Sequence, residues 1–185
     1  MTFIESETIE LKSSVVADLC KEVIAFANTR GGTLYIGVED NGTVIGVDSA
    51  DRVTLQINNM VRDSIKPDIT MFVHYETQVI NDKQIIAVIV QEGTDRPYYL
   101  GSKGLKPSGV YVRNGTSTDP ASDTAIRKMI KETDGDSFET MRSLEQNLSF
   151  QAAEAQFAKR KVPYDAAKMQ TLGMVSSDDI YSNVA

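Results

Sequence analysis

The spacing of apolar residues predicts alternating strands and helices over the first two-thirds of the chain. Residues 8–12 alternate as in a strand, so their apolar side chains share one face and Glu10 and Lys12 share the other. We expect this charged pair to face solvent. A helix with apolar residues at helical spacing follows, and Ser13 or Ser14 is the expected cap.

The next segment predicts a central strand, a tight turn and a second helix. Residues 33–38 are apolar on both faces, which is typical of a strand covered on both sides. The turn 39–42 contains Asn-Gly, and residues 44–47 are expected to return antiparallel. Ser49 should cap the second helix and Pro67 should close it, because the residue before proline resists helical geometry.

Beyond the second helix the pattern predicts a long hairpin and a basic loop. Alternation from Ile69 to Val90 indicates two strands that turn at Asn81-Asp82. Residues 97–100 and 110–113 read as short strands flanking a flexible, glycine-rich loop at 101–109.

A third helix is expected to begin at Asp119, the cap, and Pro120, and to end before Gly135. A further helical stretch is predicted at 151–160. These elements indicate the α/β (α+β) class: a mixed sheet with β-hairpins, flanked by about three helices and followed by a C-terminal helical tail.

Length and composition favour one domain with an appendage. The chain has 185 residues, of which 41% are hydrophobic, so we expect a domain at 1–133 and a helical linker at 134–185 leading toward a further domain. The single cysteine, Cys20, cannot form an internal disulfide, and the first residues lack a signal-peptide pattern. We therefore expect a cytoplasmic protein with no membrane partner.

The net negative charge counts against the prediction of a simple nucleic-acid-binding domain. The distribution of charge along the chain partly offsets this objection. The formal net charge is −7; residues 1–133 carry 14 basic and 18 acidic side chains, a net charge of −4. The stretch 96–113 contains no acid, which predicts a local basic surface with interleaved aromatic rings. Its basic and aromatic residues are Arg96, Lys103, Lys106, Arg113, Tyr98, Tyr99 and Tyr111.

Common catalytic signatures are missing from the sequence. It contains no phosphate loop ending in Gly-Lys-Ser/Thr, no His-Glu-x-x-His and no Cys-x-x-Cys. The single histidine, His74, falls on an expected strand and reads as structural. Any hydrolysis would have to use carboxylates.

Six ordered blocks resemble the Schlafen-type Alba-like domain, Schlafen AlbA_2, although Leu11 stands where that family often has Phe. The resemblance covers most of residues 5–130 and implies an Alba-like mixed sheet. The blocks are Glu5-Ser6, Glu10-Leu11-Lys12, Phe26-Ala27-Asn28-Thr29-Arg30-Gly31-Gly32, Gly37-Val38-Glu39-Asp40, Gly46, and Tyr111-Val112-Arg113-x-Gly115.

The resemblance implies two different functions. Bacterial members are commonly described as DNA-binding modules of transcriptional regulators, some of them related to RecG helicase. In animal Schlafens a duplicated version forms an endoribonuclease, in which the positions matching Glu5, Glu10 and Asp40 bind a divalent metal.

The residues themselves do not decide whether Glu5, Glu10 and Asp40 form a metal site. Glu5 and Glu10 converge only if Glu5 precedes the strand, and three carboxylates would then suit Mg²⁺ or Mn²⁺. Otherwise Glu10 is a solvated partner of Lys12, Asp40 forms a turn, and Arg113 is a structural partner of Glu10.

We expect first a non-catalytic domain that binds DNA or RNA and needs no cofactor. Its phosphate contacts would be Lys12, Arg30, Lys103, Lys106 and Arg113. The alternatives are a ribonuclease dependent on Mg²⁺ or Mn²⁺, and a protein-interaction or homodimerisation module.

Overall fold

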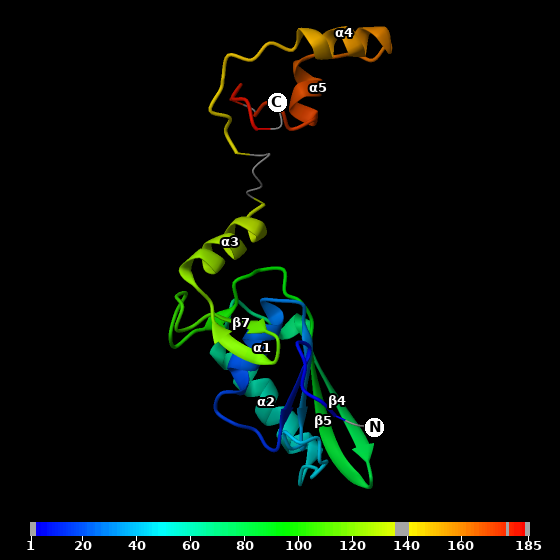
Figure 1. Ribbon diagram of the computed structural model, residues 1–185, viewed down its shortest axis with the longest axis vertical. Helices are drawn as coiled ribbons and strands as arrows, with labels where there is room; N and C mark the ends of the chain where they lie inside the picture. Colours follow the sequence, from blue (N-terminus) through cyan, green and yellow to red (C-terminus); the bar gives the residue numbers. More distant parts are fainter. Residues whose placement is uncertain (1–2, 136–140, 177, 184–185) are drawn as a thin grey trace. The chain divides into compact units, whose positions relative to one another are not determined.

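The chain divides into two compact units, Met1–Thr133 and Asp134–Ala185. The computed structural model describes residues 3–135, 141–176 and 178–183 (Figure 1). Each unit is considered by itself. No helix in these ranges combines the length and apolar character needed to cross a membrane.

A four-stranded mixed sheet forms the frame of the first unit. Its strand order is β1 (Ile9–Lys12), β2 (Gly32–Ile36), β5 (Lys83–Val90) and β4 (Val73–Ile80). β1 and β2 run parallel, and the other two pairings are antiparallel. The expected α/β class with a mixed sheet and a long hairpin is confirmed, and the arrangement is compatible with an Alba-like fold.

Two helices cover one face of this sheet, α1 (Leu19–Ala27) and α2 (Ala50–Ser64) (Figure 1). Ser49 caps α2 as expected, since its side chain accepts a hydrogen bond from the Arg52 amide. The main core lies between the helices and the sheet. A smaller cluster on the opposite face contains Phe3, Leu11, Val38 and Ile85.

Two short ribbons and a third helix complete the first unit. β3 (Ile65–Lys66) pairs with β6 (Tyr99–Leu100), and β7 (Tyr111–Asn114) pairs with β8 (Ser117–Pro120). α3 (Asp123–Thr133) packs its apolar side against residues of this region. β6 and β7 flank the glycine-rich loop, as the sequence predicts.

The described part of the second unit contains two helices and two isolated β-bridges. α4 (Gln151–Lys159) matches the expected stretch, and α5 (Ala166–Thr171) is an additional helix. The Asp165 side chain caps α5 by accepting from the Lys168 amide at 2.8 Å.

The first helix begins later than the sequence predicts. Ser13 and Ser14 do not cap it; Asp18 is the residue before the helix, and its side chain makes no capping hydrogen bond. Val15 and Val16 pack against the main core from the connecting segment, before the helix starts. Their burial outside the helix explains why apolar spacing placed the start too early.

The third helix also begins later, because Asp119 and Pro120 belong to β8. Asp119 pairs with Val112 in the β7–β8 ribbon. Ser122 takes the capping role, since its hydroxyl accepts from the Ala125 amide at 3.1 Å.

Two expected strand segments are irregular. Residues 44–47 do not form a strand and contribute one isolated bridge, between Val38 and Val44. A short 3₁₀ helix, η1 (Thr70–Phe72), occupies the first part of the hairpin strand predicted from Ile69, so β4 starts at Val73.

Candidate nucleic-acid interface

The basic loop 101–109 has a defined backbone path. Leu100 N–H donates to the Gly109 carbonyl at 2.9 Å and closes the base of the loop, and Gly109 N–H donates to Lys106 at 2.8 Å. A Cβ at Gly109 would lie 2.2 Å from the Gly104 carbonyl oxygen, so this close approach requires glycine. The loop is therefore a surface element with a defined shape.

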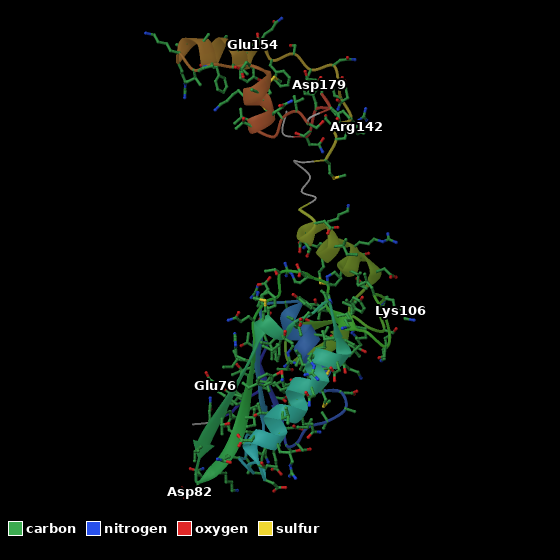
Figure 2. The ribbon with its side chains drawn as sticks, turned by 180° about the vertical axis from the view of Figure 1, so that it is seen from behind. Glu76, Asp82, Lys106, Arg142, Glu154 and Asp179 are labelled. Carbon is green, nitrogen blue, oxygen red and sulfur yellow. The ribbon has the colours of Figure 1, made fainter. Side chains whose placement is uncertain are left out.

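Lys103 and Lys106 are the two cations of this loop, and both are exposed. Among the described residues, neither ammonium group lies within 4.0 Å of a carboxylate. Figure 2 shows Lys106 on the outside of the first unit. The loop therefore presents two positive charges that no described acid neutralises at short range.

Lys21 of α1 lies beside the Tyr111 ring, a placement that the sequence interpretation missed. Its Nζ is 5.8 Å from the centre of the Tyr111 ring, and Lys103 Nζ is 6.0 Å from that centre. Asp18 pairs with Lys21 at 2.8 Å, and this hydrogen bond raises the pKa of Lys21. Tyr111 belongs to β7, and only the packing of β7 against α1 brings its ring next to Lys21, so no local sequence signal could have shown this contact.

The tyrosines near the loop are structural. Tyr98 and Tyr111 are buried, and the Tyr111 hydroxyl donates to the Ser108 carbonyl at 2.9 Å. The surface around the lysines thus lacks the exposed rings expected from the sequence, with Tyr99 half-buried. Such a surface suits phosphate contacts better than base stacking.

Arg113 lies in a buried ion-pair network. Its guanidinium is 2.7 Å from a Glu10 oxygen and 3.2 Å from a Glu22 oxygen, and its side chain is 1% exposed. It also donates to the Ser6 and Ile9 carbonyls at 3.0 and 3.3 Å. This placement corrects the interpretation of Arg113 as a surface cation and agrees with the alternative that it is a partner of Glu10.

Glu10 and Lys12 point into the same network, so the expectation of a solvated pair is wrong. Glu10 is 6% exposed and pairs with Lys12 as well as Arg113. The 2.7 Å contact between Glu10 and Arg113 is an ion pair by distance, but that Glu10 oxygen accepts no hydrogen bond of good geometry. Two cations therefore balance Glu10 and Glu22, which explains why a charged strand face can be buried.

Burial and pairing shift two pKa values in this network. Desolvation raises the pKa of Glu22, and a hydrogen bond from the Thr118 hydroxyl opposes that rise. Desolvation lowers the pKa of Lys12, but the hydrogen bond and charge of Glu10 outweigh it, and the net pKa is raised. The network thus holds Lys12 in its charged form.

The Phe-Ala-Asn-Thr-Arg-Gly-Gly block also builds the fold. Asn28 is buried; it donates to the Tyr98 and Tyr111 carbonyls, each at 2.9 Å, and accepts from the Tyr98 amide at 2.7 Å. Gly31 has a φ of +74°, and a Cβ there would lie 2.6 Å from the Val90 carbonyl oxygen. Arg30 remains exposed, with Glu7 3.9 Å away.

The three carboxylates of the metal alternative do not assemble into a site. Glu5 precedes β1, as convergence would require, but its carboxylate accepts from the Leu11 amide at 3.3 Å. Asp40 is exposed in the turn after β2, while Glu10 faces Arg113. Among the described residues, no three acidic, histidine or cysteine side chains could together hold a metal ion. These residues do not fit a bound Mg²⁺ or Mn²⁺.

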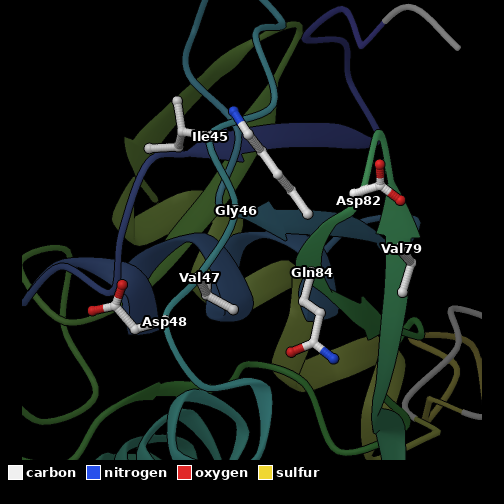
Figure 3. A pocket seen from close by; sticks show the side chains of 8 residues that line it. Ile45, Gly46, Val47, Asp48, Val79, Asp82 and Gln84 are labelled. Atoms are coloured by element: carbon white, nitrogen blue, oxygen red, sulfur yellow. The ribbon is translucent and has the colours of Figure 1, made fainter.

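The far end of the first unit carries acidic side chains. A pocket there lies between residues 45–48 and the β4–β5 hairpin, with Asp48 and Asp82 in its lining (Figure 3). Lys83 also lines it, but its ammonium donates to the Val44 carbonyl at 3.1 Å. Figure 2 shows Asp82 at the tip of the β4–β5 hairpin, away from Lys106 on the outside of the same unit.

The chain belongs to the Schlafen, AlbA_2 family, whose model matches residues 5–122. This match confirms the resemblance drawn from the six sequence blocks. Among curated proteins, none matches the chain.

Two solved structures are similar to the chain. The DIP2311 protein from Corynebacterium diphtheriae has 17% identity and a TM-score of 0.51, and the match covers 96% of this chain and 34% of that chain. The N-terminal domain of a RecG-related protein from Nitrosomonas europaea has 29% identity and a TM-score of 0.47, and covers 61% of this chain and 82% of that domain. The first likeness supports the fold alone.

Proposed function

We propose that the first unit binds duplex DNA through the loop 101–109 and serves as the DNA-binding domain of a transcriptional regulator. One observation carries the proposal: Lys103 and Lys106 are exposed on a shaped loop, and no described acid pairs with them. Membership of the Schlafen, AlbA_2 family suggests a nucleic-acid-related domain and supports it.

The side chains favour contacts to the phosphate backbone. Lysine ammonium groups contact phosphates without reading base sequence. Lys21 also lies beside Tyr111 but is paired with Asp18, and Arg113 contributes no phosphate contact because it is buried. Single-strand and RNA recognition commonly uses exposed aromatic rings, and Tyr98 and Tyr111 are buried. Duplex DNA therefore suits this surface best.

Binding should be modest and sensitive to salt. Each phosphate contact contributes a slope of about −0.9 to the dependence of log K on log salt concentration. Two lysine contacts then predict a loss of roughly tenfold in affinity between about 50 and 200 mM salt. Salt also screens the repulsion between the acidic remainder of the chain and the polyanion, which makes this dependence shallower.

Fluorescence anisotropy with a labelled duplex at low salt tests the proposal. We expect Lys103→Ala/Lys106→Ala to weaken binding and to reduce the magnitude of the salt slope by about 2. The control, Arg52→Ala/Lys83→Ala, removes the same charge at the hairpin end and should change affinity much less. Equal losses in both variants, or tighter binding of single-stranded DNA or RNA than of duplex, would contradict the proposal.

A further inference from the structure

β4 is an edge strand with an open hydrogen-bonding side. It is the last strand in the order β1-β2-β5-β4 and pairs with β5 over eight consecutive residues, Val73 to Ile80. The two-residue turn at Asn81-Asp82, with φ of 51° and 61°, makes Ile80 and Lys83 a hydrogen-bonded pair. Because these pairs alternate along an antiparallel ladder, the even-numbered residues of β4 bond to β5 and the odd-numbered ones point away.

Three residues therefore present unused backbone groups at this edge: Tyr75, Thr77 and Val79. Among the described residues, no backbone or side-chain hydrogen bond satisfies their outward N–H and carbonyl groups. Val73 differs, because its N–H already donates to the Thr70 carbonyl. The edge also lacks proline, lysine and a bulge, which are the usual devices that protect an edge strand from pairing.

We propose that β4 pairs antiparallel with β4 of a second copy of this chain, with a two-fold axis at Thr77. In this register Tyr75 faces Val79 of the second copy, and Thr77 faces its own equivalent. All three open residues then form hydrogen-bonded pairs, and six new backbone hydrogen bonds would follow from the ladder geometry. The two four-stranded sheets become one continuous sheet.

The side chains of β4 favour this register and favour a second copy of this chain as the partner. A shift that centres the axis on Glu76 would place two like charges opposite each other, whereas the Thr77 register places Glu76 opposite Gln78. On the helix-facing side, an aromatic ring meets a β-branched side chain on each side of a Thr–Thr pair, and such pairs stabilise sheets. The strand is thus complementary to itself.

Exposed apolar surface beside the strand supports the same contact. Val79 is 65% exposed, and Leu55 on α2 is 59% exposed. Leu55, Tyr75 and Thr77 line one shallow pocket between α2 and β4. The pairing would place Val79 of the second copy next to Tyr75, at the rim of this pocket, and cover apolar surface now in contact with water.

Charge variants at Thr77 test the register. By sedimentation velocity or light scattering, the full chain should be a dimer whose population rises with concentration. Thr77→Lys alone and Thr77→Glu alone should each be monomeric, because identical charges would face each other. An equimolar mixture of the two should recover dimers, because opposite charges then meet at the axis.

Gln56→Lys, on the exposed side of α2, is the matched control and should stay dimeric. Amide exchange gives a second readout: Tyr75, Thr77 and Val79 should be protected in the wild type and exchange freely in Thr77→Lys. Glu76 and Gln78 should be protected in both, because they bond to β5. A wild type that stays monomeric at all concentrations, or a mixture that fails to restore the dimer, would overturn the proposal.

Discussion

The two edge strands of the central sheet, β1 and β4, differ in whether their outward backbone groups have partners. At β1, the Arg113 guanidinium donates to the Ile9 carbonyl and pairs with Glu10, so the edge is closed by a buried charge from a distant segment. At β4, the backbone groups of Tyr75, Thr77 and Val79 have no partner among the described residues. Two of the family-like sequence blocks, Glu10-Leu11-Lys12 and Tyr111-Val112-Arg113-x-Gly115, meet at the closed edge. They maintain the fold, and the surfaces available for interaction lie elsewhere.

Removal of the cation at the closed edge should have the largest effect. Arg113→Ala leaves Glu10 and Glu22 buried without their main partner, and we expect a loss of about 3–5 kcal/mol in the free energy of unfolding. Urea denaturation followed by circular dichroism measures it. Arg62→Ala removes an exposed ion pair with Asp63 and should leave stability nearly unchanged. Similar midpoints for the two variants would show that the network does not stabilise the fold.

Loss of the Asn28 side chain should have the next largest effect. Asn28→Ala leaves one buried amide and two carbonyls without partners, at a cost of about 1–3 kcal/mol in unfolding free energy. Asn114→Ala, at an exposed position, is the control. The same denaturation experiment compares them, and equal stability would contradict a structural role for this motif residue.

Proline substitutions should separate the inward and outward residues of β4. Gln78→Pro removes an N–H that bonds to β5, whereas Thr77→Pro removes one that points to the open edge. We expect Gln78→Pro to be less stable than Thr77→Pro by roughly 1–3 kcal/mol, measured by thermal and urea unfolding at a monomeric concentration. If Thr77→Pro were the less stable variant, Thr77 would not be one of the residues on the open side of β4.

A smaller effect should appear in the pH dependence of stability. Burial raises the pKa of Glu22 above its ordinary value of 4.5, so between that value and the raised pKa the folded state binds more protons than the unfolded state. The contribution of Glu22 is therefore complete below 4.5 and is lost as the pH rises through the raised pKa. Glu22→Gln should remove this decline. Parallel pH profiles of unfolding free energy for Glu22→Gln and the wild type would contradict this contribution of Glu22.

Regular elements could be predicted from the sequence because their patterns are local. The alternation in β1, the apolar run of β2 and the Asn81-Asp82 turn each specify their own geometry. The helix starts that were predicted wrongly depend on contacts with residues outside the local pattern. Val15 and Val16 pack against the core from a segment outside the helix, and Asp119 pairs with Val112. A local pattern cannot show either contact.

The candidate site could be predicted only in part for the same reason. The absence of acids from 96–113 predicted a local basic surface, and Lys103 and Lys106 of this stretch are exposed. Arg113 belongs to the same stretch but is buried, because Glu10 and Glu22 arrive from other segments. The position of Lys21 beside Tyr111 depends on how β7 packs against α1.

Titration of the isotope-labelled chain with a short DNA duplex at low salt, followed by backbone amide chemical shifts, tests the central claim most directly. We predict shifts concentrated at residues 101–109 and at Lys21, which weaken as salt is added. The amides of β4 and of the Asp48–Asp82 pocket should stay unchanged. Shifts centred on that acidic end, or no shifts at any residue, would contradict the account.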